Sequence, residues 1–291
     1  MGYSARYHAT SLIAVFVALA IGVVIGAALG GDTLTDTRKD LERSLTGNLE
    51  DARERADQLS AELGYSNEFA ERVYPVLARD RLQGMRIGIV ALGGLSGGVS
   101  AAIEETLEPT GGRLVAVGVV REPVDLRGLA GELSSSRFAN LAQDPEAQAE
   151  FGVGVGRQLV LGGGLLERVR SQLFSRASGN FRLLDGVIVV RSQPQDMGQV
   201  QRSTASRIES GLAQGIVATR ATAVGVEPIG AEPSSISFFQ GNDLTSIDHV
   251  DLVAGRLATV LALRGAEGSF GVKGSADSLL PDLLGPAPAR R

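Results

Sequence analysis

Residues 86–105 read RIGIVALGGLSGGVSAAIEE, and this stretch decides the fold of the chain. The apolar, β-branched run at 86–92 predicts a short buried strand. The glycine-rich residues 93–98 predict a tight turn, and residues 99–108 have the apolar spacing of a helix. A strand, a turn and a helix in this order are typical of folds in which parallel strands alternate with helices.

The same alternation continues along the chain. Three more apolar runs predict buried strands, at 114–120, 186–191 and 223–227. Apolar residues at helical spacing predict helices at about 154–174, 203–221 and 248–263.

This pattern predicts an α/β fold. Continuously apolar strands between helices favour a mostly parallel sheet that is covered on both faces. We therefore expect residues 83–284 to form a Rossmann-like or flavodoxin-like three-layer domain, with a disordered tail at 285–291.

The amino-terminal segment predicts a transmembrane anchor. Residues 9–31 include no charged side chain, and a helix of that length is roughly 34 Å long, enough to cross the core of a bilayer. Arg6 precedes the segment, whereas Asp32 and Asp36 follow it. This charge bias predicts that residues 1–8 are cytoplasmic and that the main domain is extracytoplasmic.

A cleaved signal peptide is the alternative interpretation of this segment. Gly26 and Ala28 are small enough for a cleavage site, although the apolar run is longer than the usual core of a signal peptide. Under either interpretation the main domain lies outside the cytoplasm. We expect a single-pass protein of the cell membrane or envelope.

Small side chains recur at every fourth position of the predicted span. They are Ala14, Ala18, Gly22, Gly26 and Gly30. Such a stripe lets a second helix approach closely, so it favours a homodimer within the membrane. Alanine and glycine are also common in membrane spans that do not pair.

The next segment, 32–82, predicts a helical stalk. Leu45, Leu49 and Leu59 occupy the two apolar positions of a heptad repeat, which is typical of a coiled coil. A single helix that packs on the domain is the alternative. A break is predicted after Gly64, followed by a short helix at 68–81.

The composition excludes several classes of function. There are 28 basic and 33 acidic side chains, which give a net charge of -5, and the arginines are scattered, so a nucleic-acid partner is not expected. The chain has no cysteine, which excludes disulfides, thiolate metal sites and cysteine nucleophiles.

The glycine-rich turn matches one catalytic motif. Residues 94–98, GLSGG, fit the G-x-S-x-G pattern that exposes a nucleophilic serine in α/β-hydrolases, with Ser96 as the nucleophile. His249 and a neighbouring aspartate would have to complete the triad. The serine follows the first strand of the domain, so no earlier loop can supply a second oxyanion donor. We therefore expect a structural turn and no enzymatic activity, and a serine hydrolase that uses Ser96 is the second alternative.

Polar residues cluster before the last predicted helix. They are Asp243, Asp248, His249 and Asp251. Aspartates in such a loop are predicted to cap the helix, because carboxylates stabilise helix amino termini. The pattern assigns no cofactor and no metal ligands.

Several stretches resemble one known family. Near the carboxyl terminus they are EPSSI at 232–236, DLTSIDHVDLVAGR at 243–256 and FGVKGSADSLLP at 270–281; near the amino terminus, Arg6 to His8 and the span that begins at Ser11 also fit. On these residues the chain resembles the MctB copper transporter family of actinobacterial envelope proteins.

The resemblance implies an envelope protein named for copper efflux and described as an outer-membrane channel, with copper as a possible ligand. It also implies relatives that act with a membrane partner in envelope assembly and division, so a non-enzymatic module that recruits a second envelope protein is the rival interpretation. An outer-membrane pore requires a closed barrel of alternating strands, and the few predicted strands are apolar on both faces. No copper-binding residue can be transferred from the family.

Overall fold

The computed structural model of the protein describes residues 4–194 and 196–282. The chain divides into two units between Ser66 and Asn67. The predicted tail at 285–291 lies outside the described residues.

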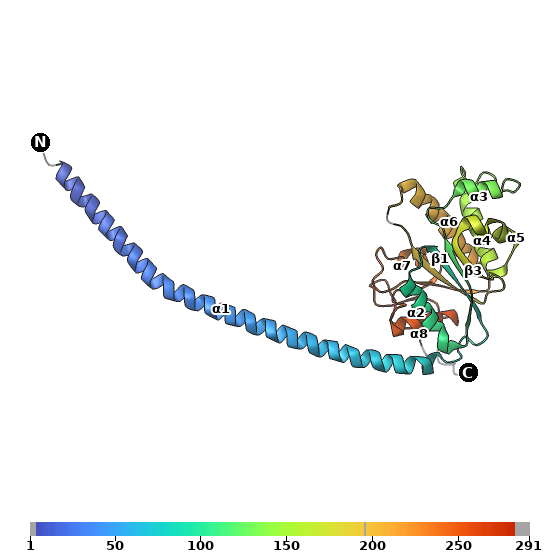
Figure 1. Cartoon of the computed structure of the whole chain (residues 1–291), viewed down its shortest axis with the longest axis horizontal. Helices are drawn as coiled ribbons and strands as arrows, with labels where there is room; N and C mark the ends of the chain where they lie inside the picture. Colours follow the sequence, from blue (N-terminus) through green and yellow to red (C-terminus); the bar gives the residue numbers. More distant parts are fainter. Residues whose placement is uncertain (1–3, 195, 283–291) are drawn as a thin grey trace, which may run out of the picture. The chain divides into compact units, whose positions relative to one another are not determined.

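Helix α1, Ser4–Ala78, is continuous over 75 residues (Figure 1). Of the described residues, Thr10–Ala28 is the stretch that is long and apolar enough to cross a membrane, with a mean hydropathy of 2.7. The predicted break after Gly64 is wrong, because α1 continues through this position. A glycine inside a helix costs only about 1 kcal/mol relative to alanine, and the turn before Gly64, at 61–63, consists of strong helix formers. The helix predicted at 68–81 is therefore the end of α1.

The second unit contains one sheet of seven strands. They are β1 (Arg86–Gly93), β2 (Arg113–Val120), β3 (Phe174–Gly179), β4 (Gly186–Ser192), β5 (Thr222–Val226), β6 (Thr245–Ile247) and β7 (Ser269–Phe270). Their order is β3-β2-β1-β4-β5-β6-β7, and every neighbouring pair is parallel except β2 and β3. The four predicted strands are confirmed to within one residue at each end, and the mostly parallel α/β sheet is confirmed.

The strands missed from the sequence lie toward the edges of the sheet. β3 reads FSRASG and is largely exposed, because it is an antiparallel edge strand that contributes one buried aromatic side chain, Phe174. β6 and β7 have only three and two residues. Neither strand is long enough to form an apolar run of its own.

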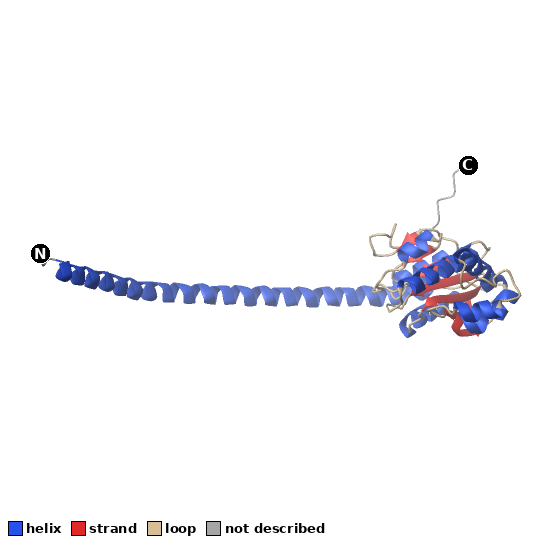
Figure 2. Ribbon diagram, turned by 90° about the horizontal axis from the view of Figure 1, so that it is seen from above, coloured by secondary structure: helices blue, strands red, loops and turns tan. Residues whose placement is uncertain are grey.

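Helices cover both faces of the sheet (Figures 1 and 2). One core contains the end of α1 with α2 (Gly97–Leu107) and α8 (Val253–Leu263). The short 3₁₀ helix η1, Glu108–Thr110, follows α2. The other core contains α3 (Leu126–Glu132), α4 (Pro145–Leu161), α5 (Gly164–Leu173), α6 (Gln199–Val217) and α7 (Ile236–Gly241).

Helices α4 and α6 approach each other closely because glycines face each other. A Cβ atom at Gly156 would lie 2.2 Å from the carbonyl oxygen of Leu212, and one at Gly215 would lie 2.2 Å from that of Val153. Real Cβ atoms do not approach backbone this closely. This packing fixes α6 against α4, and with it the polar side chain that α6 contributes to the site described next.

Candidate functional site

Charged residues gather where the parallel strands end. Open α/β sheets bind ligands at the carboxyl ends of their strands, where the strand order reverses, and here that reversal lies between β1 and β4. The charged residues at or after these ends are Glu122 (β2), Arg191 (β4), Glu227 (β5), Asp248 (β6) and Lys273 (β7). They form two groups.

The first group is centred on Glu209 of α6. Its side chain is 1% exposed, and its Oε2 atom lies 3.0 Å from both Nε and Nη2 of Arg191. The amide of Gln193 donates a third hydrogen bond to the same oxygen at 2.9 Å. The ring of Phe238 lies 4.5 Å from the guanidinium carbon of Arg191, so the cation is held on two sides.

Glu122 completes this group. Both of its carboxyl oxygens are buried, and no hydrogen-bond donor in the described part of the chain reaches either; the neighbouring group is a second carboxyl, that of Glu209. Burial and, after it, the neighbouring Glu209 together raise the pKa of Glu122 to about 9, and Arg191 offsets the rise only in part. Because Glu209 Oε1 also lacks a partner, a protonated Glu122 has an acceptor available in Glu209.

The glycine-rich turn after β1 lies against Glu122. Gly93 has a φ of +88°, and a Cβ atom there would lie 2.3 Å from the carbonyl oxygen of Ser192 and 3.0 Å from Glu122 Oε2. Only glycine fits this position. The prediction of a tight structural turn is confirmed.

The second group is centred on Glu227, whose side chain is 2% exposed. Its carboxylate accepts hydrogen bonds from the Lys273 ammonium at 2.5 Å, from Ser234 Oγ at 2.7 Å and from the backbone N–H of Ser235 at 2.5 Å. The carboxylate is thus fully enclosed by donors.

Asp248 holds the segment that carries Lys273. Its carboxylate accepts the backbone N–H of Val272 at 3.0 Å and that of Lys273 at 2.7 Å. A Cβ atom at Gly271 would lie 2.0 Å from Asp248 Oδ1, so this approach also requires glycine. The predicted capping role is wrong, because α8 begins only at Val253 with Leu252 as its amino-terminal cap. The predicted helix start at 248 was therefore five residues too early.

Asp251 and Asp243 do not cap α8 either. Asp251 accepts the backbone N–H of Ile229 at 2.8 Å and so joins the loop after β5 to the loop after β6. Asp243 lies in the turn after α7 with a φ of +58°. Aspartate tolerates such backbone conformations, which is a second reason, besides capping, for its abundance in loops.

The second group therefore joins residues from three separate stretches of the sequence between residues 232 and 281. Ser234 and Ser235 belong to EPSSI, Asp248 to the stretch at 243–256, and Lys273 to FGVKG. Sequence reasoning missed Glu227 and Lys273. The available signal was that Lys273 is one of only two lysines in the chain.

The structure does not assemble the serine triad. His249 Nδ1 lies 3.0 Å from Asp248 Oδ1, while its Nε2 is buried with no hydrogen-bond partner among the described residues. Burial lowers the pKa of His249, and Asp248 offsets this in part, so the ring is neutral near pH 7. Ser96 Oγ instead accepts the backbone N–H of Val99 at 3.3 Å and caps α2.

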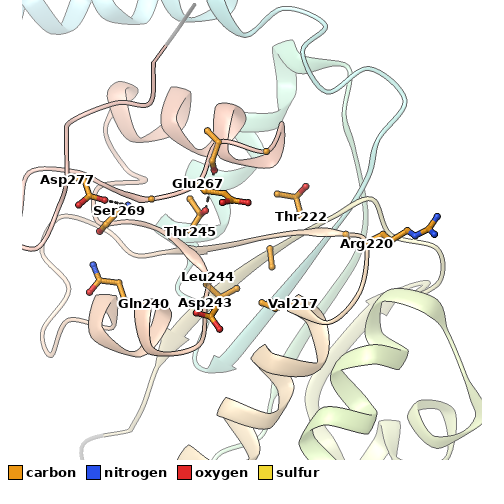
Figure 3. Close-up of a pocket in the computed structure, with 15 residues that line it drawn as sticks. Val217, Arg220, Thr222, Gln240, Asp243, Leu244, Thr245, Glu267, Ser269 and Asp277 are labelled. Atoms are coloured by element: carbon orange, nitrogen blue, oxygen red, sulfur yellow. Dashed lines mark hydrogen bonds between the residues drawn. The ribbon is translucent and has the colours of Figure 1, made fainter. Parts of the chain in front are cut away.

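A hollow of about 600 Å³ lies at the opposite ends of the strands, on the amino-terminal side of the sheet (Figure 3). It opens where β5, β6 and β7 begin, and Thr222, Thr245 and Ser269 line it. Asp277, at one side of the hollow, accepts the backbone N–H of Ser269 at 2.9 Å. The two charged groups lie at the other ends of the strands, where the orphaned oxygens of Glu122 are found.

The described residues contain no group of three or more His, Cys, Asp or Glu side chains placed to hold a metal ion. Glu122 and Glu209 are a pair of hard oxygen donors, and Arg191 neutralises one of them. Cu(I) prefers thiolate and thioether donors. These residues therefore do not fit a Cu(I) site.

The predicted interface residues all lie on α1. A Cβ atom at Gly22 or Gly26 would meet nothing within 4 Å, and Gly30 lies in the same helix. The side chains of Leu45, Leu49 and Leu59 are exposed by 59%, 51% and 60%. Their pairing with a second chain stays a prediction.

The family comparison covers both the helix and the sheet. A family model described as "Copper transport outer membrane protein, MctB" matches residues 3–281. The chain belongs to the MctB family. The resemblance drawn from the carboxyl-terminal stretches is thereby confirmed, and the matched region includes α1 and both charged groups of this MctB chain. None of the curated proteins matches the chain.

Proposed function

We propose that this MctB-family chain is a single-pass protein of the cell envelope that acts in copper transport or efflux. The observation that carries the proposal is the family match over residues 3–281, which includes the apolar helix Thr10–Ala28. The family description supplies the copper and the envelope, and the helix supplies a means of attachment. The chain has no cysteine, so it would act in transport without a thiolate copper site.

The proposed orientation places the amino terminus in the cytoplasm and the α/β body outside it. The positive charge of Arg6 before the span and the aspartates after it support this orientation. The body would be a non-enzymatic, Rossmann-like domain: the order β3-β2-β1-β4-β5-β6 is the one known for that fold, with β3 reversed.

Deletion of the coding sequence tests the role in copper transport. Loss of the protein should raise the copper content of the cell and its sensitivity to copper, and the full chain should restore both. A variant that lacks residues 9–31 should fail to restore them, whereas one with an unrelated apolar span of equal length should succeed. Unchanged copper content after deletion would remove the transport proposal.

The orientation has its own test, because the native chain is free of cysteine. Leu183→Cys places a thiol on a side chain that is 62% exposed on the body. A membrane-impermeant maleimide should label this variant in intact spheroplasts. Labelling that occurs only after lysis would contradict the proposed orientation.

The exposed leucines of α1 favour a second function, self-association through a coiled-coil stalk. Helices with apolar residues at heptad spacing pair in water because pairing removes those side chains from solvent. The small-residue stripe at Gly22, Gly26 and Gly30 would continue the pairing within the membrane. A heptad repeat that is complementary to itself favours a homodimer. The alternative is that the same stalk binds a second envelope protein.

Single cysteines test the register of the stalk. Leu49→Cys and Leu59→Cys lie at the predicted contact positions, so mild oxidation of membranes should give disulfide-linked dimers. Glu54→Cys is the matched control, since it lies on the opposite side of the heptad and is also exposed. Equal cross-linking at all three positions, or at none, would contradict a parallel coiled coil in this register.

A further inference from the structure

Three buried carboxylate oxygens at the carboxyl ends of the strands have no hydrogen-bond donor among the described residues. They are both oxygens of Glu122 and Oε1 of Glu209. Glu209 is almost completely buried, at 1% exposure, while its Oε2 is occupied by Arg191 and Gln193. Buried polar atoms normally have hydrogen-bond partners, so three orphaned acceptors at one place require an explanation.

The charges that face these oxygens do not balance two ionised carboxylates. Arg191, from β4, is the one cation acting on Glu122 among the described groups, and it already pairs with Glu209. Arg121 precedes Glu122 in the chain, but its guanidinium donates to the carbonyl oxygens of Gln172 and Phe174. With both carboxyl groups ionised, the group would carry two negative charges against one positive charge. Two like charges in a buried site disfavour each other's ionised form.

We propose that Glu122 and Glu209 form a buried site for one proton, in which the carboxylic acid of Glu122 donates a hydrogen bond to the carboxylate of Glu209. This arrangement gives Glu209 Oε1 a donor and leaves a neutral group: one carboxylate, one guanidinium and one acid. The site joins the end of β2 to helix α6 across the reversal point of the sheet.

The packing around Glu122 supports a small occupant. The backbone at Gly93 lies so close that a single added Cβ atom would be 3.0 Å from Glu122 Oε2. A proton needs no additional volume, and it needs no ligands beyond the two carboxyl groups. A divalent cation would need more oxygen donors than this pair offers and would be repelled by Arg191.

Loss of the proton has a structural consequence. Glu122 begins a loop in which Pro123 and Asp125 are exposed, so the ionised side chain has a short path to solvent. We expect the end of β2 to separate from α6 when the proton leaves. The pair is therefore a pH-sensitive contact at the position where folds of this class bind their ligands.

Infrared spectroscopy of the full chain in detergent micelles tests the proposal directly. A protonated carboxylic acid absorbs apart from a carboxylate, and ordinary carboxyl groups are ionised at pH 7. We expect the wild type to show one protonated carboxyl band at pH 7, which disappears with a midpoint near pH 9. Glu122→Gln should lack the band. Glu132→Gln, which changes an exposed side chain of α3, should keep it.

Absence of the band from the wild type at pH 7, or its persistence in Glu122→Gln, would overturn the proposal. If Glu122→Gln does not fold, Glu122→Asp replaces it, and its band should titrate at a different pH from that of the wild type. An unchanged titration would also overturn the proposal.

Millimolar Mn²⁺ or Cu²⁺ should leave the wild-type band in place at pH 7. Loss of the band on adding either ion would identify a metal site and overturn the proton site.

Thermal unfolding gives an independent measurement. The folded pKa of Glu122, about 9, lies above its usual value of 4.5, so the folded state holds the proton more tightly than the unfolded state does. The contribution of Glu122 to the free energy of unfolding should therefore be greatest below about pH 4.5, and it should decrease as the pH rises toward about 9. The unfolding temperature of Glu122→Gln should fall less than that of the wild type between pH 6 and pH 10. Parallel curves would contradict the proposal.

Discussion

The hydroxyl of Tyr74, near the end of α1, donates a hydrogen bond to the backbone carbonyl oxygen of Thr106 in α2 at 2.5 Å. Tyr74 is 4% exposed, and burial raises the pKa of its hydroxyl, so the group stays protonated and remains a donor. Thr106 belongs to the last turn of α2, where backbone carbonyls lack partners within the helix. The bond therefore satisfies an acceptor that the helix itself leaves free.

Tyr74→Phe removes this bond and keeps the ring. We expect a loss of about 1–2 kcal/mol in the free energy of unfolding, because a buried carbonyl oxygen is left without a donor. Hydrogen exchange should become faster in residues 67–78 of α1. Tyr65→Phe is the control, since Tyr65 is 73% exposed, and it should leave both measurements unchanged. Equal effects of the two variants would contradict the role assigned to Tyr74.

Arg256 of α8 should make a second contribution to the same packing. Its Nη2 atom lies 2.7 Å from Glu105 Oε2 of α2, and its Nη1 lies 3.4 Å from Glu71 Oε2 of α1. The arginine side chain is 13% exposed, whereas Glu71 and Glu105 are 53% and 54% exposed, so salt screens these pairs in part. Arg256→Met should cost about 1–2 kcal/mol in the free energy of unfolding, measured by denaturant titration. The loss should shrink in high salt, and Arg79→Met serves as a control outside this cluster. No loss at low salt would show that the contacts are neutral.

Four strands could be predicted from the sequence for a physical reason. β1, β2, β4 and β5 lie in the interior of the sheet, so each contributes a run of apolar side chains to two cores. β3 at the edge needs only one apolar anchor, and its other side chains are free to be polar. A mostly polar segment of six residues has no periodic pattern of apolar side chains, so the sequence does not distinguish a strand from a loop there.

The charged groups could not be predicted, because they depend on the topology. Glu122 and Glu209 are far apart in the chain, and they become neighbours because α6, which follows β4, packs beside the carboxyl end of β2. His249 and Asp248 looked like capping or catalytic residues because they are adjacent in the sequence. Asp248 instead accepts the backbone N–H groups of Val272 and Lys273, which lie more than 20 residues further along the chain, and His249 Nδ1 lies beside Asp248.

The glycines of α4 and α6 give a third prediction. Gly215→Ala places a methyl group 2.2 Å from the carbonyl oxygen of Val153, so the helices must move apart. Overpacking of this kind costs about 1–3 kcal/mol, which exceeds the gain of up to about 1 kcal/mol that alanine brings to a helix. The unfolding temperature should fall. Gly131→Ala, in α3 with nothing within 4 Å, should leave it unchanged or raise it.

The pKa of His249 predicts a loss of stability in mild acid. Burial lowers this pKa below the usual 6.5, so the folded state holds the proton less tightly than the unfolded state does. Stability should therefore fall as the pH decreases from about 6.5 toward the lowered value. His249→Gln should flatten the dependence between pH 7 and pH 5. His8→Gln changes the only other histidine and should retain the wild-type slope. A wild-type slope in His249→Gln would show that other groups cause the acid sensitivity.

Lys273 gives the sharpest test of the second charged group. Lys273→Met removes the ammonium from the Glu227 carboxylate and keeps most of the aliphatic stem, which leaves Glu227 with its two serine donors. A buried carboxylate without its counter-ion is strongly destabilising, so we expect a loss of about 2–3 kcal/mol in the free energy of unfolding. Glu227→Gln combined with Lys273→Met should recover part of this loss, because the neutral amide needs no counter-ion. If the loss of stability in the double variant equals the sum of the losses in Glu227→Gln and Lys273→Met, the two side chains are not coupled. The ion pair at the carboxyl ends of the strands would then contribute nothing to stability. If the double variant recovers stability, the pair fixes the segment 271–273 against the loop after β5, since no other cation contacts Glu227 among the described residues.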